Sequence, residues 1–596
     1  MNEKAVPPVV PPRTDGTLGD MPARNAREAP SHIAFRRRAG DAWAPVTAAQ
    51  FDAEVEALAK GFVASGVTPG QRVGIMARTR YEWTLLDFAL WCCGAVPVPI
   101  YETSSAEQVQ WILEESGAVG VVVESAAHLA TVESVRHATP RVTDVWGIDA
   151  GDLANITASG RDVSDGALVA TRAGLDRSSP ATIIYTSGTT GRPKGVGLTH
   201  GNFLDLVENA GEAFRSLVHY PGASTLLFLP LAHVFARFIE VLCVDAGVTM
   251  GHSADIKTLV DDFGAFQPTF ILAVPRVFEK IYNSADAKAT TEGKGKIFAT
   301  ATATAIAYSE ALDTGRVPLG VRARHLVFDK LVYGRLRAAM GGKLLYAVSG
   351  GAPLGTRLGH FFRGVGVTIL EGYGLTETTA PATVNRPETV RIGTVGTPLP
   401  GCAVAIAEDG EILIRGVGTF HGYHNNDAAT AEAIHDGWFH SGDIGELDAD
   451  GYLRITGRKK ELLVTAGGKN VAPAVLEDRL RAHLLVSQCI VVGDQKPFIA
   501  ALVTLDEEMI PVWAKANGIE GLTIEGARTN PAVLAEVQKA VDEANAAVSK
   551  AESIRKFVIL DTDFTEASGH LTPSLKLRRT IIMRDFGDEV EALYGG

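Results

Sequence analysis

Alternating strand-like and helical segments, which begin at about Thr47, limit most strongly what this chain can fold into. Residues 49–65 carry apolar side chains at helical spacing, residues 72–76 form a short buried-strand pattern, and residues 81–91 are helical again. Strand patterns return at 119–123 and 182–185. Repeated alternation of this kind predicts an α/β domain with mainly parallel sheets packed by helices.

The pattern changes after Leu399, where short alternating strands follow at 411–415, 452–456 and 461–464. A last segment has strand patterns at 489–492 and 500–504 and a helix at 531–547. A chain of 596 residues is expected to hold at least two domains. We therefore predict a flexible Pro-rich tail over residues 1–30, a large multi-subdomain domain over 31–459 and a small, mobile α+β domain over 460–596.

Composition excludes several classes of protein. The formal net charge of −13 argues against a general nucleic-acid binder. The 5 cysteines have no metal-ligand or disulfide spacing, and no secretory signal is visible, so we expect a reducing, cytoplasmic location. The apolar run at 88–100 is too short to span a bilayer, and peripheral attachment at the inner face of the membrane is left open.

Residues 288–342 form an Ala-rich, basic region with a helix expected at 297–312. Several arginines and lysines follow this helix, namely Arg316, Arg322, Arg324, Lys330, Arg335 and Arg337. We favour a solvated helical face over a membrane-surface patch for this region.

A loop rich in glycine and hydroxyl side chains follows the strand at 182–185. It starts at Thr186, continues through Ser187, Gly188, Thr189, Thr190 and Gly191, and reaches Lys194 and Gly195. Glycines let successive backbone amides converge on an anion, and Lys194 adds a positive charge. The spacing does not fit the common NTPase loop, yet the combination predicts a polyphosphate site.

The same loop matches the signature of the adenylate-forming (AMP-binding) superfamily. Further blocks match in the expected order, at 349–353 (Ser-Gly-Gly-Ala-Pro), 371–377 (Glu-Gly-Tyr-Gly-Leu-Thr-Glu), 441–443 (Ser-Gly-Asp), 457–460 and 467–473. The resemblance covers nearly the whole chain beyond residue 30 and is greatest to bacterial long-chain fatty acyl-CoA synthetases. It implies ATP, Mg²⁺, coenzyme A and a long-chain fatty acid as reactants and ligands.

The resemblance also assigns roles to residues of these blocks. It implies that Glu377 holds Mg²⁺, that Thr376 lies near the α-phosphate, and that Lys194 contacts phosphates. Asp443 would bind the ribose hydroxyls, Arg458 would hold the ribose or phosphate from the domain junction, and Tyr373 would face adenine. The remaining nucleotide-site residues implied by position are Gly350, Gly351, Ala352, Glu371, Gly372 and Gly374.

Residues of the small domain are implied in both steps of the reaction. Lys576, in a Pro-Ser-Leu-Lys setting that departs from the common Ser-Gly-Lys, would bridge the substrate carboxylate and the α-phosphate. Lys460 maps to the hinge about which the small domain rotates, and Gly467, Gly468 and Lys469 would line the pantetheine tunnel.

Two positions bear on the chain length of the substrate acid. His233 would lie near the acyl site, although a structural histidine is about equally expected from residue type. Gly374 occupies the position where short-chain relatives carry tryptophan, which leaves room for an alkyl chain. Two alternatives stay open here: a fatty acyl-AMP ligase that serves a carrier protein, and a catalytically silent nucleotide-binding protein.

Overall fold

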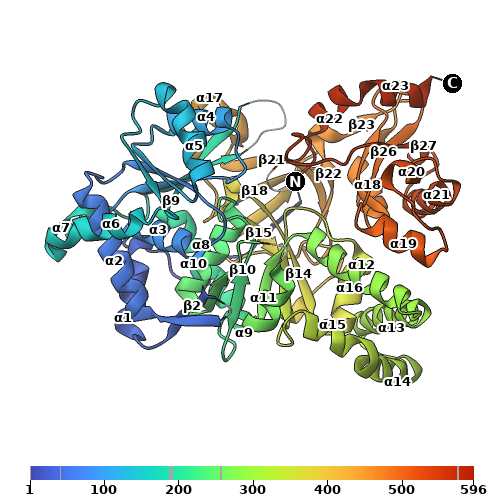
Figure 1. The fold of residues 1–596 in the computed structure, drawn as a ribbon, viewed down its shortest axis with the longest axis horizontal. Helices are drawn as coiled ribbons and strands as arrows, with labels where there is room; N and C mark the ends of the chain where they lie inside the picture. Colours follow the sequence, from blue (N-terminus) through green and yellow to red (C-terminus); the bar gives the residue numbers. More distant parts are fainter. Residues whose placement is uncertain (1, 41, 187–191, 256–257, 573–575, 596) are drawn as a thin grey trace.

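The computed structural model describes residues 2–40, 42–186, 192–255, 258–572 and 576–595 (Figure 1). The chain forms a large domain and a smaller C-terminal one, each with its own hydrophobic core. The expected combination of α/β and α+β architecture is confirmed.

A central sheet positions much of the site. Its strands in sheet order are β16 (Thr397–Pro398), β15 (Ala380–Val384), β14 (Thr368–Leu375), β13 (Tyr346–Ser349), β12 (Phe270–Ala273), β10 (Ser224–Leu227), β11 (Thr249–His252), β2 (Ile33–Ala39) and β3 (Ala42–Thr47). The strands from β14 to β2 pair in parallel, whereas both edges are antiparallel. The carboxyl ends of parallel strands therefore meet at one edge, where α/β proteins usually bind ligands.

A second parallel sheet lies beside the first, with order β5 (Val96–Ile100), β4 (Arg72–Met76), β6 (Gly120–Val123) and β7 (Asp144–Gly147). The hairpin β8 (Pro180–Thr186) and β9 (Lys194–Thr199) packs next to it and extends to β19 (Gly422–Tyr423). Helices α2 (Ala48–Ala64), α3 (Tyr81–Cys92), α4 (Ala106–Ser116), α8 (His200–Ala213) and α10 (Val234–Ala246) connect and cover these strands.

A distal antiparallel sheet leads to the small domain. It contains β17 (Cys402–Ile406), β18 (Glu411–Gly416), β21 (Trp438–Leu447), β20 (Ile434–His435) and β22 (Leu453–Arg458). The small domain is built on β25 (Val486–Val492), β26 (Ile499–Leu505) and β27 (Ile554–Ile559), with α18 (Pro473–Arg481), α19 (Met509–Ala516) and α21 (Pro531–Asn545). Three further helices, α12 (Pro275–Thr291), α13 (Gly295–Asp313) and α16 (Thr356–Val365), cover the far end of the central sheet.

The N-terminal segment corrects the expectation of a flexible tail over residues 1–30. Strand β1 (Asn2–Ala5) pairs antiparallel with β17, in register from Asn2 with Ile406 to Ala5 with Ala403. The backbone amide of Val9 then donates to Asn209 Oδ1 at 2.8 Å. We call residues 2–20 the N-terminal strap, because they join the distal sheet to helices near the start of the large domain.

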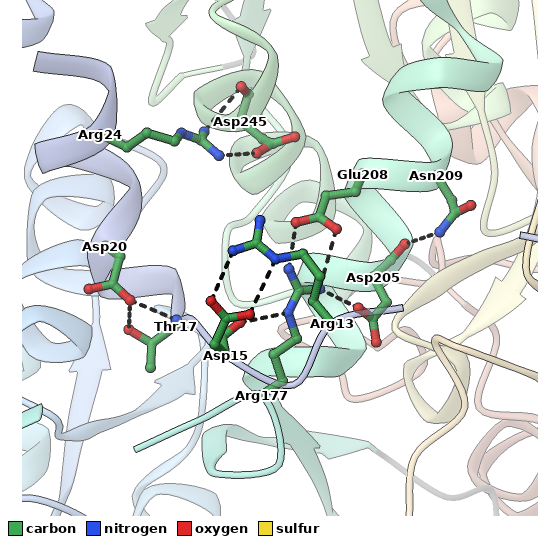
Figure 2. A network of polar contacts seen from close by, with 10 residues as sticks. All are labelled: Arg13, Asp15, Thr17, Asp20, Arg24, Arg177, Asp205, Glu208, Asn209 and Asp245. Atoms are coloured by element: carbon green, nitrogen blue, oxygen red, sulfur yellow. Dashed lines mark hydrogen bonds and ion pairs between the residues drawn. The ribbon is translucent and has the colours of Figure 1, made fainter. Parts of the chain in front are cut away.

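Ion pairs and hydrogen bonds hold the strap at its middle (Figure 2). Arg177 Nε donates to the carbonyl of Asp15 at 3.0 Å, and the same guanidinium pairs with Asp205 and with Glu208. At Gly19 a Cβ would lie 2.6 Å from the carbonyl oxygen of Trp91, so the strap packs there at a distance that only glycine permits. Its proline-rich composition predicted a flexible tail. Contacts with residues far away in the sequence instead hold the segment in an ordered conformation.

The expected elements are present with ends within three residues of those predicted. The strand expected at 461–464 is shortened, because a 3₁₀ turn (Lys459–Glu461) precedes β23 (Leu463–Val464). In the described ranges, no helix combines the length and the apolar character that crossing a bilayer demands.

Candidate active site

A cavity of about 2290 Å³ opens at the carboxyl ends of the parallel strands and between the two domains. It brings together predicted residues from distant parts of the chain. Those that line it are Thr186, Lys194, His233, Gly350, Gly351, Ala352, Glu371, Gly372, Tyr373, Gly374, Thr376, Glu377, Asp443, Arg458, Lys460 and Lys576. Ser187, Gly188, Thr189, Thr190 and Gly191 lie outside the described residues.

The β8–β9 hairpin delivers the two ends of the predicted phosphate loop to the cavity. Thr186 and Lys194 face each other across the hairpin as its last paired residues. The ammonium of Lys194 lies 4.9 Å from the ring centroid of Tyr423, a cation–π distance that holds the charge at the cavity wall.

A strained turn presents Thr376 and Glu377. The two residues occupy a 3₁₀ turn (Thr376–Thr378) between β14 and β15, and the next two residues, Thr379 and Ala380, have φ values of 57° and 86°. Residues other than glycine rarely adopt such backbone φ angles, so contacts with the surrounding structure must stabilise them. Hydrogen bonds do so: Thr379 Oγ1 donates to the carbonyl of Gly418 at 2.6 Å, and the hydroxyl of Thr378 joins the turn to Ala380.

Glu377 is a buried carboxylate with a tyrosine beside it. Burial raises its pKa, while the hydroxyl of Tyr423, which donates to Glu377 Oε1 at 2.9 Å, favours the ionised form. Lys576 and Arg458 act in the same direction through their charge. Tyr423 was not predicted from the sequence, because a single tyrosine 46 residues from its partner carries no local signal.

This carboxylate fits a magnesium ion held mainly by phosphates. The described residues contain no cluster of three or more histidine, cysteine or acidic side chains suited to a metal. Mg²⁺ commonly takes one or two protein carboxylates and completes its shell with water and substrate phosphates, so a single Glu377 is sufficient.

Asp443 is held from both sides. Tyr373 donates its hydroxyl to Asp443 Oδ2 at 2.7 Å, and Arg458 donates Nε to Oδ1 at 2.8 Å. Asp443 and Arg458 face each other across the β21–β22 pair, so the ladder itself sets this ion pair. Each carboxylate oxygen keeps a second lone pair that can accept from a ligand hydroxyl.

The segment after β13 is supported by Glu371. Its carboxyl accepts the backbone amide of Leu354 at 3.1 Å, and burial raises the pKa of Glu371 to about 8. Gly351 has a φ of 84°, and a Cβ at Gly350 would lie 3.0 Å from the ring of Phe235. These glycines bring the backbone to the cavity, and Glu371 fixes the loop that follows them.

Lys576 reaches the cavity from the small domain. Its amide donates to Thr572 Oγ1 at 3.0 Å, and the neighbouring Leu577 pairs with Leu571 in an isolated antiparallel bridge. Lys576 is exposed to the open cavity, yet desolvation by the enclosing walls and the charge of Arg458 lower its pKa, against the opposing effect of Asp443 and Glu377.

His233 caps the start of α10. Burial and the charge of Lys576 lower the pKa of His233 to about 3, so the imidazole is neutral at physiological pH. Its Nδ1 accepts the amide of Phe235 at 3.2 Å, which leaves the proton on Nε2. His233 can therefore donate a hydrogen bond into the cavity.

Gly374 has a structural reason to be glycine in addition to the predicted one. It lies at a bulge between β14 and β15, where a Cβ would fall 1.9 Å from the carbonyl oxygen of Ala380. Any side chain here would collide with backbone, so a tryptophan could not enter without moving this turn. Its assignment to the acyl pocket stays a prediction.

The predicted tunnel residues are not brought to the cavity. Gly467, Gly468 and Lys469 form an exposed turn between β23 and β24 (Asn470–Val471), and Lys469 Nζ lies 3.4 Å from Glu552. Lys460, by contrast, lines the cavity within the turn that joins the domains. The arrangement seen here therefore presents Lys576, and the tunnel residues would need a movement of the small domain to reach the site.

Known protein families match the chain in two parts. A family model described as AMP-binding enzyme matches residues 22–424, and one described as AMP-binding enzyme C-terminal domain matches residues 460–596.

Curated relatives match along all or most of their length. A long-chain-fatty-acid–CoA ligase named FadD15 from Mycobacterium bovis is 48% identical over 598 residues and covers 100% of both chains. A long chain acyl-CoA synthetase 7, peroxisomal, from Arabidopsis thaliana is 30% identical, covering 98% of this chain and 83% of its own.

Solved structures share the fold at lower identity. The A-PCP didomain of carboxylic acid reductase from Segniliparus rugosus, in complex with AMP, has a TM-score of 0.76 at 22% identity, covering 97% of this chain and 82% of its own. O-succinylbenzoate coenzyme A synthetase from Bacillus subtilis, in complex with ATP and a magnesium ion, has a TM-score of 0.67 at 21% identity, with 94% and 98% covered.

Proposed function

The chain belongs to the AMP-binding enzyme family, and we infer from this and from its full-length similarity to FadD15 that it is a long-chain fatty acid–CoA ligase. In the first step a fatty-acid carboxylate oxygen attacks the α-phosphorus of ATP, and the bond to the β-phosphate oxygen breaks, which releases pyrophosphate. In the second step the sulfur of coenzyme A attacks the acyl carbonyl carbon. The acyl–phosphate bond breaks, AMP leaves, and the thiol proton passes to solvent.

The meeting of Lys576 with the large-domain residues supports the first step most directly. Lys576, Glu377 and the Asp443–Arg458 pair line one cavity although they come from both domains. Attack of a carboxylate on a polyphosphate joins two anions, so positioning and charge neutralisation are the main tasks of the protein. A mobile ammonium between the carboxylate and the α-phosphate performs both.

We propose the remaining nucleotide contacts from the family resemblance, which the shared position of these residues in the cavity supports. Lys194 and its loop hold the departing phosphates, and Asp443 accepts hydrogen bonds from the ribose. Tyr373 faces adenine, with its ring fixed by the 2.7 Å bond to Asp443. Glu377 holds Mg²⁺, whose chemistry is to neutralise phosphate charge in the first step. Thr376 precedes it on the strained turn and lies toward the α-phosphate.

The second step requires the small domain to turn about Lys460. That movement withdraws Lys576 and brings Gly467, Gly468 and Lys469 to the cavity, where glycines leave room for the pantetheine arm. Contacts between the domains must break, among them the ion pair between Arg276 and Asp506 at 3.4 Å.

We propose that the acyl chain binds near His233 and Gly374. The neutral His233 donates a hydrogen bond from Nε2 to the substrate carboxylate. Because the imidazole is uncharged, no ion pair has to break when the carboxylate attacks. Each methylene buried in an apolar pocket contributes about 0.8 kcal/mol to binding, which favours long acids over short ones.

Measuring the two half-reactions separately tests this function. Purified protein with ATP, Mg²⁺ and a long-chain acid should release pyrophosphate without coenzyme A, and adding coenzyme A should then yield the thioester. Pyrophosphate release with no thioester, even after coenzyme A is added, would favour a fatty acyl-AMP ligase. Absence of pyrophosphate release with every acid from acetate to long-chain acids would leave a nucleotide-binding protein without this activity.

A further inference from the structure

An outlying helix, α14 (Leu319–Phe328), presents large apolar side chains to solvent. It follows α13 at the edge of the molecule, at the lower right of Figure 1, and continues into a π-helical turn (Asp329–Tyr333) and α15 (Gly334–Ala339). The exposed fractions are 83% for Leu319, 63% for Leu326, 55% for Val327 and 55% for Leu331. We call these four residues the outer apolar face.

The helical spacing arranges this face in a particular way. Successive residues turn by about 100°, so Leu319, Leu326 and Val327 project from one side of α14. Arg322 and Arg324 lie on the two flanks of the same side, and both are exposed. An apolar stripe bordered by arginines is the pattern of a helix that lies in a membrane interface.

The inner side of α14 packs against the protein through specific contacts. The exposed apolar side chains therefore do not belong to a core-facing side of a misoriented helix. His325 Nε2 bonds to the carbonyl of Gly364 at 2.7 Å, and its ring stacks on Tyr308 with centroids 3.8 Å apart. In the π-helical turn, the hydroxyl of Tyr333 donates to the carbonyl of Ala301 at 2.7 Å. The orientation of the helix is therefore set from within the protein.

The charge around the face opposes that of the whole chain. Residues 316–337 contain 6 basic side chains and 1 acidic one, Asp329, whereas the chain carries −13 overall. Asp329 pairs with Arg337 at 2.7 Å. Within the described ranges the other basic residues, Arg316, Arg322, Arg324, Lys330 and Arg335, form no ion pair with a carboxylate. Their charge remains available to an external anion.

We propose that the outer apolar face, with its flanking arginines, docks this protein on an anionic lipid surface. The four apolar side chains enter the boundary between headgroups and acyl chains, and the arginines bind lipid phosphates. A solvated helical face, which the sequence favoured, accounts for the arginines but not for the exposed leucines. A symmetric contact with a second copy is disfavoured, because it would bring the same arginines against each other.

Docking at this place would bring the catalytic cavity toward the lipid. Cavity-lining residues recur along α12 from Pro275 to Thr290, and α12 packs against α13. If the substrate is a long-chain acid, as proposed above, it partitions into the same surface. This link rests on the proposed function, whereas the docking itself does not.

Vesicle sedimentation with the full-length protein tests the proposal. The vesicles contain either phosphatidylcholine alone or phosphatidylcholine with phosphatidylglycerol. One variant combines Leu319→Ser, Leu326→Ser and Leu331→Ser, and a second combines Arg322→Gln with Arg324→Gln. The matched control combines Val169→Ser with Arg161→Gln, exposed residues near α7 (Asp165–Arg172) at the opposite side of the molecule in Figure 1.

We expect the unmodified protein and the control to bind the phosphatidylglycerol vesicles at least about tenfold more tightly than phosphatidylcholine alone. The leucine variant should lose at least about tenfold of that affinity, and the arginine variant about fivefold for each arginine removed. Both variants should keep the unmodified thermal unfolding and the unmodified rate of pyrophosphate release with a medium-chain acid in solution.

Three results would overturn the proposal: equal binding of all variants, no binding of the unmodified protein to anionic vesicles, or self-association that the leucine variant abolishes without any vesicle binding. The last result would assign the face to a second copy. Because catalysis is measured without lipid, failure of docking and failure of the proposed reaction are read out separately.

Discussion

Replacing Tyr423 by phenylalanine removes the hydroxyl that donates to Glu377 and leaves the aromatic ring that faces Lys194. The hydroxyl stabilises the ionised form of a buried carboxylate, so its loss raises the pKa of Glu377 further. The proposed magnesium site needs the ionised form of Glu377. The variant should therefore lose activity at a higher pH than the unmodified enzyme as the pH falls.

The size of the effect follows from the burial of the pair. A hydrogen bond to a charged group contributes about 1.5–3 kcal/mol, and about 1.4 kcal/mol corresponds to one pH unit in a titration. Glu377 is only 8% exposed, so water replaces the lost donor poorly. We expect the acid limb of the pH–rate profile to move upward by about one to two pH units.

The assay is the initial rate of pyrophosphate release between about pH 5.5 and 9, with saturating ATP, Mg²⁺ and acid and no coenzyme A. Tyr452→Phe is the matched control, because its hydroxyl donates to the carbonyl of Thr389 at 2.7 Å, away from the cavity. Glu377→Gln cannot ionise and should be inactive across the range. An acid limb that is the same in Tyr423→Phe and Tyr452→Phe would refute the reasoning.

Three further outcomes are expected. Lys576→Ala should abolish pyrophosphate release but retain thioester formation from supplied acyl-adenylate, and near-normal adenylation would remove this lysine from the mechanism. Gly374→Ala should lower the free energy of unfolding by about 1–3 kcal/mol, measured by urea denaturation, because its Cβ would meet Ala380; an unchanged stability would show that the turn moves freely. Cysteines introduced at Arg276 and Asp506 and joined by a short crosslinker should preserve pyrophosphate release and block thioester formation, because the small domain can no longer turn. The five native cysteines are buried, so the crosslinker should react with the introduced pair. Full thioester formation would contradict domain rotation.

Local patterns predicted the elements well where side-chain periodicity carries the information. The helix expected at 297–312 is α13 (Gly295–Asp313), and the strand expected at 72–76 is β4. The order of the motif blocks identified most of the residues that line the cavity. These signals depend on neighbouring residues or on the order of motifs along the chain, so they can be recognised without knowing the fold.

Features that depend on distant partners were not accessible in this way. Tyr423 acquires its place only when β19 pairs with β9. The close approach at Gly374 depends on two positive φ angles in the following turn, at Thr379 and Ala380, neither of which is glycine. The exposure of Leu326 could not be separated from core packing until the partners of α14 were known.

The strap also constrains how the chain can be made. Strand β1 leaves the ribosome roughly 400 residues before β17, its only ladder partner among the described strands. At a synthesis rate of about 5–20 residues per second, β1 stays unpaired for on the order of 20–80 seconds before β17 is made. Closing so long a loop is slow and leaves the strand edge exposed meanwhile. A fusion partner placed before Asn2 would act on this late event, and we expect it to change the yield of folded protein more than the catalytic rate.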